Sequence, residues 1–344
     1  MQKDFILGVG CQKGATTWLR SQLNNHEKSN FGFAKEYHVF DSLYNLESID
    51  HKVLKEYLYK KFIINNDFMS SYKKDHSSMK LKYLKLFGSF SKDNLKVIKN
   101  KLSRKYLLMK SNFIKPDKNN HLSYTRYHFD IDIRNYFDYF NSLFLSDKEL
   151  STTGDITPEY AGLPVEAFKY IKKNLEQKQF QVKIIFIMRD PLERIRSQAR
   201  MIFAKNNYLE IESENKSLMQ SIHFKNLEDE FVKYLYKNPS IVFRTRYENT
   251  INNLEKVFKK ENIFYCLYEN LFTEETLDRI SSFLNLRNLS FDTKKIIWQT
   301  SKQDYQLNLS NEVKNNISNF YRDTYSICDE RFNASSFWES YKFI

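Results

Sequence analysis

Short apolar runs alternate with amphipathic stretches along much of this chain. The run at 5–9 predicts a buried strand, and Leu19 and Leu23 share one face of the helical pattern that follows it. The run at 182–188 is the clearest buried-strand pattern in the sequence, and the run at 263–268 predicts another strand. Amphipathic patterns predict helices at 165–174, 227–236, 247–259, 273–284 and 312–321.

Strands that alternate with helices are typical of an α/β fold with a mainly parallel sheet. The first strand, turn and helix follow the order of a P-loop unit, so we predict a P-loop-like, mainly parallel sheet flanked by helices. Between 45 and 150, lysine-rich helical patterns alternate with aromatic segments. We predict that 45–150 is a largely helical insertion that caps the ligand face, within a single domain spanning 1–344.

The amino-acid composition shows that the chain is basic. The net charge of +12, most of it from lysine, favours an anionic ligand or substrate. Basic residues interleaved with Tyr and Phe in 45–150 are typical of nucleic-acid or sugar binding. Amphipathic helices with solvated lysine faces show the same pattern, and we favour them. Only seven Gly and five Pro argue against long linkers or low-complexity segments.

The cysteine content and the N-terminal residues of the chain indicate its cellular compartment. The three cysteines, Cys11, Cys266 and Cys328, are an odd and sparse set, which fits a reducing compartment better than a disulfide framework. The chain enters its first strand almost directly after Met1, without a signal-peptide pattern or an apolar run near twenty residues. We expect a cytoplasmic protein with no membrane span; the sequence does not indicate its oligomeric state.

The turn between the first strand and helix has the composition of an anion-binding loop. Gly10 and Gly14 let the backbone approach a ligand closely, and the N–H groups at the start of the helix point toward an anion. Lys13 adds a full positive charge, and Thr16 and Thr17 add hydroxyl donors. An ordinary strand–helix turn is the alternative interpretation.

A second cluster follows at 35–41, with Lys35, Glu36, His38 and Asp41 close together. If this segment is extended, Glu36 and His38 lie on one face, because side chains alternate along a strand. A carboxylate and an imidazole just beyond an anion loop form a candidate general-base site. The alternative is a polar strand edge.

The third candidate is the end of the strand at 182–188. Arg189 follows this strand directly, at the carboxyl end where open α/β sheets place their ligands. Pro191 in the next turn is typical of a helix start, and Ser197 lies two turns into that helix. We expect Ser197 to reach the same pocket as Arg189.

In this order and spacing, the three motifs resemble the PAPS-dependent sulfotransferases, especially the carbohydrate branch with the heparan sulfate sulfotransferases and bacterial relatives. The resemblance covers 4–41 and 151–204, with weaker echoes at 241–286 and at the C-terminus. Lys35-Glu-Tyr-His-Val-Phe-Asp41 is similar to the Lys-Glu-x-His-Phe-Phe-Asp of the heparan-type enzymes. Arg189-Asp-Pro with Ser197 looks like the family's motif for the 3′-phosphate of the donor.

The resemblance implies a transferase that uses PAPS, whose two anionic ends require two anion sites. The 5′-phosphosulfate would lie in the loop, and Arg189 with Ser197 would hold the 3′-phosphate. Trp18 matches a family position that contacts adenine, with core packing as the alternative, and Tyr247 is similar to a tyrosine near the purine. The predicted loop contacts are Gly10, Gln12, Lys13, Gly14, Ala15, Thr16 and Thr17.

The resemblance also implies roles in catalysis, with no metal. Lys13 would stabilise the leaving oxygen, and Glu36 would be the general base, with His38 as the alternative base. Lys35 would position the donor or the acceptor. Asp155 and Thr157 would lie on the acceptor side.

The acceptor side departs from the heparan-type pattern at one position. The chain has Asp155-Ile-Thr-Pro where those enzymes have Glu-Lys-Thr-Pro. With Ile156 in place of that lysine, a glycosaminoglycan acceptor is no longer the implied one. We expect instead the hydroxyl of a carbohydrate or of a small metabolite.

Two other functions remain open at this point. A P-loop kinase would explain the loop, but the loop lacks the Gly-Lys-Ser/Thr ending and no aspartate at a strand end clearly suits magnesium. A non-catalytic polyanion-binding protein would explain the basic, aromatic stretch at 45–150. We expect a small-molecule or glycan acceptor as partner and no nucleic acid.

Overall fold

A parallel β-sheet lies at the centre of the protein. The computed structural model describes residues 3–44, 129, 132–205, 223–286, 289–294 and 309–344. Within these residues the sheet has four strands in the order β2-β1-β3-β4, and every neighbouring pair is parallel. The strands are β1 (Lys3–Gly10), β2 (Thr152–Ile156), β3 (Phe180–Met188) and β4 (Ile263–Leu267). The predicted α/β class with a mainly parallel sheet is confirmed.

The strand order determines where a ligand site is expected. After β1 the chain returns to β2 on one side of β1, and after β2 it crosses to β3 on the other side. The connection therefore changes direction between β1 and β3, and open α/β sheets bind ligands at such a point, beyond the carboxyl ends of the strands. The loop after β1 and Arg189 after β3 both lie at this edge.

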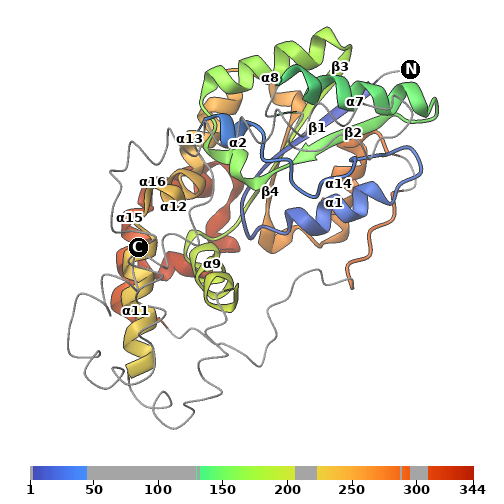
Figure 1. Cartoon of the computed structure of the whole chain (residues 1–344). Coiled ribbons are helices and arrows are strands. Elements are labelled where there is room, and N and C mark those ends of the chain that lie inside the picture. The colour runs from blue at the N-terminus through green and yellow to red at the C-terminus, as the bar shows by residue number, and fades with distance from the viewer. Residues whose placement is uncertain (1–2, 45–128, 130–131, 206–222, 287–288, 295–308) are drawn as a thin grey trace, which may run out of the picture. The chain divides into compact units, whose positions relative to one another are not determined.

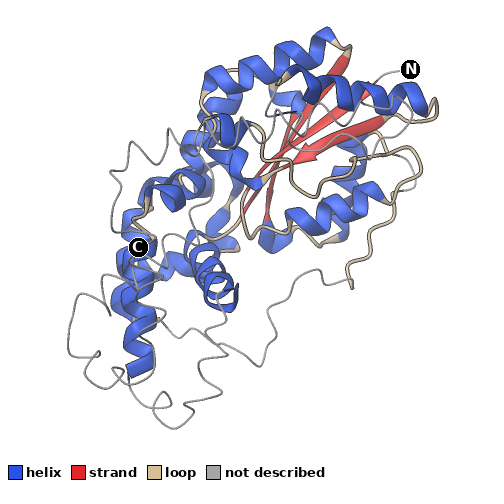
Figure 2. Ribbon diagram, in the orientation of Figure 1, coloured by secondary structure: helices blue, strands red, loops and turns tan. Residues whose placement is uncertain are grey.

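Helices cover both faces of the sheet (Figure 2). On β1, Phe5 packs edge-on against Phe140 of α7, with ring centroids 5.0 Å apart. The next residue, Ile6, points the other way into a core with Leu19 of α1 and Ile280 of α14. Figure 1 accordingly shows α7 and α8 on one face and α1 and α14 on the other. These helices are α1 (Thr16–Asn24), α7 (Arg134–Ser146), α8 (Val165–Gln177) and α14 (Glu274–Leu284).

The remaining described helices are labelled in Figure 1 where there is room. They are α2 (Phe40–Leu43), α9 (Pro191–Lys205), α11 (His223–Leu235), α12 (Pro239–Thr245), α13 (Tyr247–Glu255), α15 (Asn311–Phe320) and α16 (Arg322–Phe332). Short 3₁₀ helices are η3 (Pro158–Gly162), η4 (Lys260–Asn262), η5 (Tyr268–Asn270), η6 (Ala334–Ser336) and η7 (Glu339–Phe343). The described helices contain no segment both long and apolar enough to cross a membrane.

The structure differs from the sequence predictions in several helices, and it shows the form of the segment at 29–41. The predicted helix at 247–259 ends at Glu255, and α12 and α16 were not predicted. The segment at 29–41 is not a strand: apart from a single bridge between Ser29 and Thr152 it is irregular until α2 begins at Phe40. Several of its backbone N–H groups, such as those of Tyr37 and Val39, bind side chains, whereas the Asn30 N–H binds the Thr152 carbonyl oxygen of β2 at 3.0 Å.

The predicted insertion at 45–150 can be compared with the structure over its last part only. Residues 45–128 and 130–131 lie outside the described residues. Within the described part, α7 buries an aromatic face that includes Tyr136 and Phe140. This helix therefore belongs to the layer that packs on β1.

Candidate active site

The loop after β1 is shaped by left-handed backbone conformations. Gly10, Lys13 and Ala15 have φ angles of 145°, 70° and 62°. A Cβ atom at Gly14 would lie 2.9 Å from the Cys11 Sγ atom, so this position requires glycine. Ala15 precedes α1 without a side-chain hydrogen bond to the helix N-terminus. The first N–H groups of α1, at Thr16 and Thr17, are thus left without a side-chain cap, as an anion site requires.

Arg189 lies beside this loop. Its Nη1 atom donates a hydrogen bond to the Lys13 carbonyl oxygen at 3.0 Å, and its guanidinium lies 4.5 Å from the centre of the Tyr268 ring. The Arg189 Nε atom is buried and has no hydrogen-bond partner among the described residues. The structure therefore brings Arg189 and the loop together, as the sequence predicted. Ser197 lies further along, on α9, with 8% of its surface exposed.

His38 lies between two carboxylates. Its Nδ1 atom is 2.8 Å from Asp41 Oδ2, and its Nε2 atom is 3.2 Å from Glu36 Oε2. The predicted association of Glu36 with His38 is present, although the segment is a loop and His38 has a φ of 53°. Lys35 Nζ lies 3.5 Å from Glu36 Oε1, which adds a second cation beside that carboxylate.

These contacts determine the charges in the cluster. Burial lowers the pKa of His38, but its hydrogen bonds to Asp41 and Glu36 outweigh burial and raise that pKa to about 10. Burial raises the pKa of Glu36, but the contacts with His38 and Lys35 outweigh burial and leave it below its usual value. At neutral pH the cluster therefore contains an imidazolium beside the ionised carboxylate of Glu36.

Glu159 connects this cluster to the loop, and the sequence analysis missed it. Its Oε1 atom accepts hydrogen bonds from Gln12 Nε2 at 3.1 Å and from Arg244 Nη1 at 3.2 Å. Its Oε2 atom lies 3.8 Å from His38 Nδ1 and has no hydrogen bond among the described residues. Glu159 is 3% exposed and Arg244 is fully buried. The only sequence signal was a glutamate directly after Thr157-Pro158 in an otherwise buried segment.

The same cluster has the spacing of a cation site. One ligand atom from each of Glu36, His38 and Glu159 lies within 4.8 Å of the others. Both ring nitrogens of His38 already face carboxylates, and a metal ligand must be a neutral imidazole. We therefore interpret the group as an ion-paired cluster.

Asp155 and Thr157, predicted on the acceptor side, are buried and hydrogen-bonded to other parts of the protein. Both residues have no exposed surface, and Thr157 Oγ1 donates to Asp155 Oδ1 at 2.6 Å. The hydroxyls of Tyr136 and Tyr160 donate to the other Asp155 oxygen at 2.9 and 2.8 Å. Thr157 Oγ1 in turn accepts from the Tyr37 N–H at 3.0 Å. The two residues hold the segment that carries Glu36.

Trp18 and Tyr247 also pack in the interior instead of facing an open site. Trp18 is 4% exposed, its ring lies between Phe272 and Phe291, and its Nε1 atom donates to the Asp292 carbonyl oxygen at 3.0 Å. The core-packing alternative accounts for its position. Tyr247 is fully buried, and its hydroxyl donates to the Arg189 carbonyl oxygen at 2.8 Å. Tyr247 thus fixes the main chain at Arg189 through this hydrogen bond.

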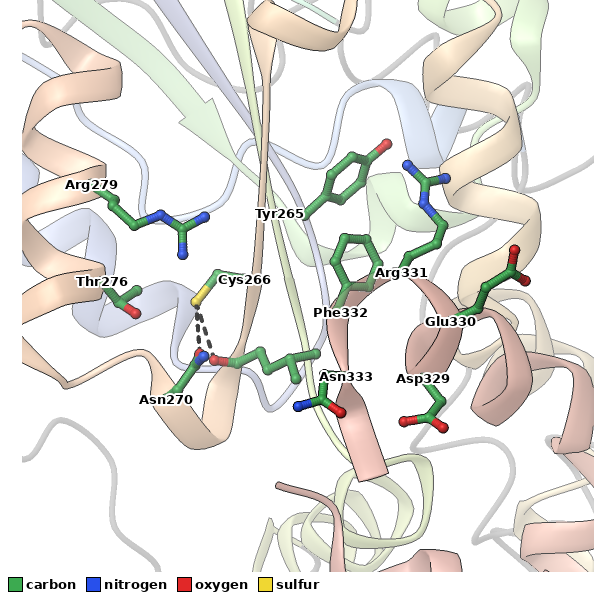
Figure 3. A pocket seen from close by; sticks show the side chains of 11 residues that line it. Tyr265, Cys266, Asn270, Thr276, Arg279, Asp329, Glu330, Arg331, Phe332 and Asn333 are labelled. Atoms are coloured by element: carbon green, nitrogen blue, oxygen red, sulfur yellow. Dashed lines mark hydrogen bonds between the residues drawn. The ribbon is translucent and has the colours of Figure 1, made fainter. Parts of the chain in front are cut away.

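A separate hollow lies on the outer side of β4, between α14 and α16 (Figure 3). It measures about 560 Å³ and is lined by charged and polar side chains, among them Arg279 and Asp329. Cys266 lies in it with a thiol whose pKa is raised to about 12 by burial, so the thiol is protonated and unreactive. The hollow contains none of the predicted site residues.

Comparison with known proteins gives a weak structural similarity. No protein-family model matches this chain, and no curated protein matches it. Among solved structures it is similar to the crystal structure of a sulfotransferase from Alicyclobacillus acidocaldarius, with 14% sequence identity and a TM-score of 0.48. That alignment covers 96% of each chain. A similarity at this level does not assign an activity, which must be argued from the site residues.

Proposed function

We propose that this protein is a PAPS-dependent sulfotransferase that transfers the sulfuryl group to a hydroxyl of a carbohydrate or a small metabolite. One observation carries the proposal: Arg189 contacts the loop after β1 directly, and the cluster around His38 is connected to that loop through Glu159. Arg189 binds the Lys13 carbonyl oxygen, and Glu159 links Gln12 to the cluster around His38. A donor with two anionic ends and an acceptor that must lose a proton need these three elements in one place.

The loop and Arg189 have the chemistry for the two ends of the donor. The uncapped N-terminus of α1, with Thr16 and Thr17, would hold the 5′-phosphosulfate. Arg189 and Ser197 would hold the 3′-phosphate, for which a guanidinium is suited by its forked donors. Lys13 would stabilise the charge that develops on the leaving phosphate oxygen.

Glu36 is the base that this cluster favours. In the proposed step the acceptor oxygen forms a bond to sulfur, the bond between sulfur and the 5′-phosphate oxygen breaks, and the acceptor proton moves to the Glu36 carboxylate. His38 is held as an imidazolium and has no free lone pair for a proton at neutral pH. We therefore assign His38 and Lys35 to positioning and charge balance around Glu36.

A kinase is less well supported than a sulfotransferase. Asp190, which follows β3, would be the magnesium-binding candidate, but it is 2% exposed. Its Oδ1 atom accepts from the Leu192 N–H at 3.0 Å and from the Tyr325 hydroxyl at 2.8 Å. Its other oxygen accepts from the Ser340 N–H at 3.3 Å. Both carboxylate oxygens of Asp190 are therefore used in hydrogen bonds within the protein, which disfavours their binding magnesium.

Transfer of labelled sulfate from PAPS to a panel of sugars, glycolipids and phenols tests the proposal directly. We expect labelled product with at least one acceptor class, together with binding of PAP by calorimetry. Magnesium-dependent hydrolysis of ATP without any binding of PAP would instead support the kinase. A cytoplasmic location is part of the proposal, and the free, buried state of Cys11, Cys266 and Cys328 supports it.

A further inference from the structure

Two arginines on α9 extend the positive charge that begins at Arg189. Arg196 and Arg200 are one turn apart and therefore share a face of the helix. Glu193 lies on the same face, with its Oε1 atom 3.1 Å from Arg196 Nη1. Ser197 is three residues before Arg200 and borders this face. Arg189 precedes the helix at the end of β3, so the basic groups run from the loop along α9.

The guanidinium of Arg200 lies close enough to those of Arg196 and Arg189 to be affected by their charges. The pKa of Arg200 is lowered, first by burial and then by the charges of Arg196 and Arg189, while Glu193 opposes the shift. Glu193 is the acidic group that faces Arg200 among the described residues. Among the described residues, three cations against one carboxylate around Arg200 leave an excess of positive charge in a partly buried place, which is unfavourable unless an anion offsets it.

The hydrogen-bond donors of these arginines are also incompletely used. The Nε atoms of Arg189, Arg196 and Arg200 are all buried and have no hydrogen-bond partner among the described residues. A buried donor without an acceptor destabilises the folded protein. A tetrahedral oxyanion supplies several acceptor oxygens together with the missing negative charge, and arginine binds it through paired N–H donors.

We propose that Arg196 and Arg200, together with Arg189, bind an oxyanion of the phosphate or sulfate class next to the loop after β1. Arg196 and Arg200 lie outside the motif residues from which the donor site was inferred. The inference rests on the proposed function only for the source of the anion. That source is either the 3′-phosphate of the donor or an acidic group carried by the acceptor.

The test compares the wild type with the double variant Arg196→Met/Arg200→Met, in which methionine keeps much of the length of the side chain without its charge. Arg134→Met/Arg322→Met is the matched control, because these two arginines are exposed and bind Asp132 and Asn319, which are outside the proposed site. Calorimetry or NMR titration measures binding of inorganic phosphate, PAP and adenosine 5′-phosphate. Melting temperatures and circular dichroism show that each variant is folded.

We expect the Arg196/Arg200 double variant to bind inorganic phosphate at least tenfold more weakly than the wild type and the control. If PAP weakens to a similar extent while adenosine 5′-phosphate does not, the anion is the donor's 3′-phosphate. If PAP is unaffected, the anion belongs to the acceptor. Unchanged binding of both phosphate and PAP in a folded double variant would overturn the inference.

This experiment separates the inference from the proposed function. Wild-type binding of phosphate that depends on Arg196 and Arg200, with no binding of PAP, would leave the anion site standing and remove the sulfotransferase proposal. If the wild type transfers sulfate from PAPS but the Arg196/Arg200 double variant binds phosphate and PAP as tightly as the wild type, the sulfotransferase proposal stands and the anion site is removed. The single variant Arg200→Lys adds a check, because it keeps the charge but loses the forked donor; we expect an intermediate affinity.

Discussion

At the scale of single residues, the most informative feature is the division of roles between Glu36 and His38. The sequence places both in one cluster but leaves open which of them accepts a proton. In the structure each ring nitrogen of His38 faces a carboxylate, Asp41 on one side and Glu36 on the other. This arrangement favours the charged imidazole and leaves Glu36 as the candidate base.

Glu36→Gln tests the assignment of the base. The amide keeps the size of the side chain and a hydrogen-bonding oxygen but cannot accept the proton, so we expect kcat to fall by about 10²–10⁴ while the affinity for PAP changes little. Sulfate-transfer kinetics and calorimetry with PAP measure the two effects. Glu339→Gln, at an exposed carboxylate near the C-terminus, is the control. Full activity of Glu36→Gln combined with an inactive His38→Gln would transfer the role to His38.

The protonation of His38 gives a second prediction at this scale. Its pKa is about 10 in the folded protein against an ordinary value of 6.5. Its contribution to stability is therefore fully present below about pH 6.5 and is lost as the pH rises toward 10. We expect NMR of the ¹⁵N-labelled imidazole to show an imidazolium at pH 8. The free energy of unfolding in urea should fall more between pH 6.5 and 9.5 for the wild type than for His38→Gln; equal changes would contradict this pKa.

At the scale of elements, the short 3₁₀ helix η3 joins the loop after β1 to the cluster around His38. Glu159 on η3 contacts Gln12 of the loop, Arg244 of α12 and, more distantly, His38. Burial raises the pKa of Glu159, and the charges of Arg244 and His38 oppose that shift. A buried carboxylate that connects three elements in this way sets the geometry between them.

Glu159→Gln should therefore affect both stability and donor binding. It removes the negative charge beside a fully buried Arg244, and breaking a buried ion pair costs about 3–5 kcal/mol. Urea denaturation measures this loss, and we also expect the KM for PAPS to rise because Gln12 loses its anchor. Glu255→Gln is the matched control: its pair with Arg331 is about one-quarter exposed, so we expect a loss below about 1 kcal/mol. A loss for Glu159→Gln no larger than the control's would argue against the bridging role.

The sequence predicted some of these elements and could not predict others, for physical reasons. The strands β1, β3 and β4 follow from continuous apolar runs, because a strand covered on both faces by helices needs no polar side. The segment at 29–41, whose extended form was only a conditional premise of the sequence analysis, is largely irregular in the structure. Several of its N–H groups bind side chains distant in the chain: Tyr37 binds the Thr157 hydroxyl and Val39 binds the Tyr160 hydroxyl at 3.2 Å. No local pattern of polar and apolar residues encodes such contacts.

At the scale of the whole molecule, the strand order brings distant motifs to one edge of the sheet. The change of direction between β1 and β3 places the loop beside Arg189, although 176 residues separate Lys13 from Arg189 in the chain. Motif chemistry can be inferred from sequence, but this proximity depends on strand order. Glu159 was missed for the same reason, since its partners Gln12 and Arg244 lie far from it in sequence.

Because the proposed donor site joins segments from both halves of the chain, PAP should stabilise the whole protein. A ligand that binds only the folded state at a concentration of 100 times its Kd adds about 2.7 kcal/mol to the free energy of unfolding. We expect a higher melting temperature with PAP, a smaller shift at high salt because the contacts are ionic, and no shift with uncharged adenosine. Lys13→Ala and Arg189→Ala should each reduce the shift. Because the two side chains would bind the same donor molecule from neighbouring positions, the two losses should be non-additive in a double-mutant cycle. No shift with millimolar PAP in the wild type would count against a donor site spanning β1 and β3.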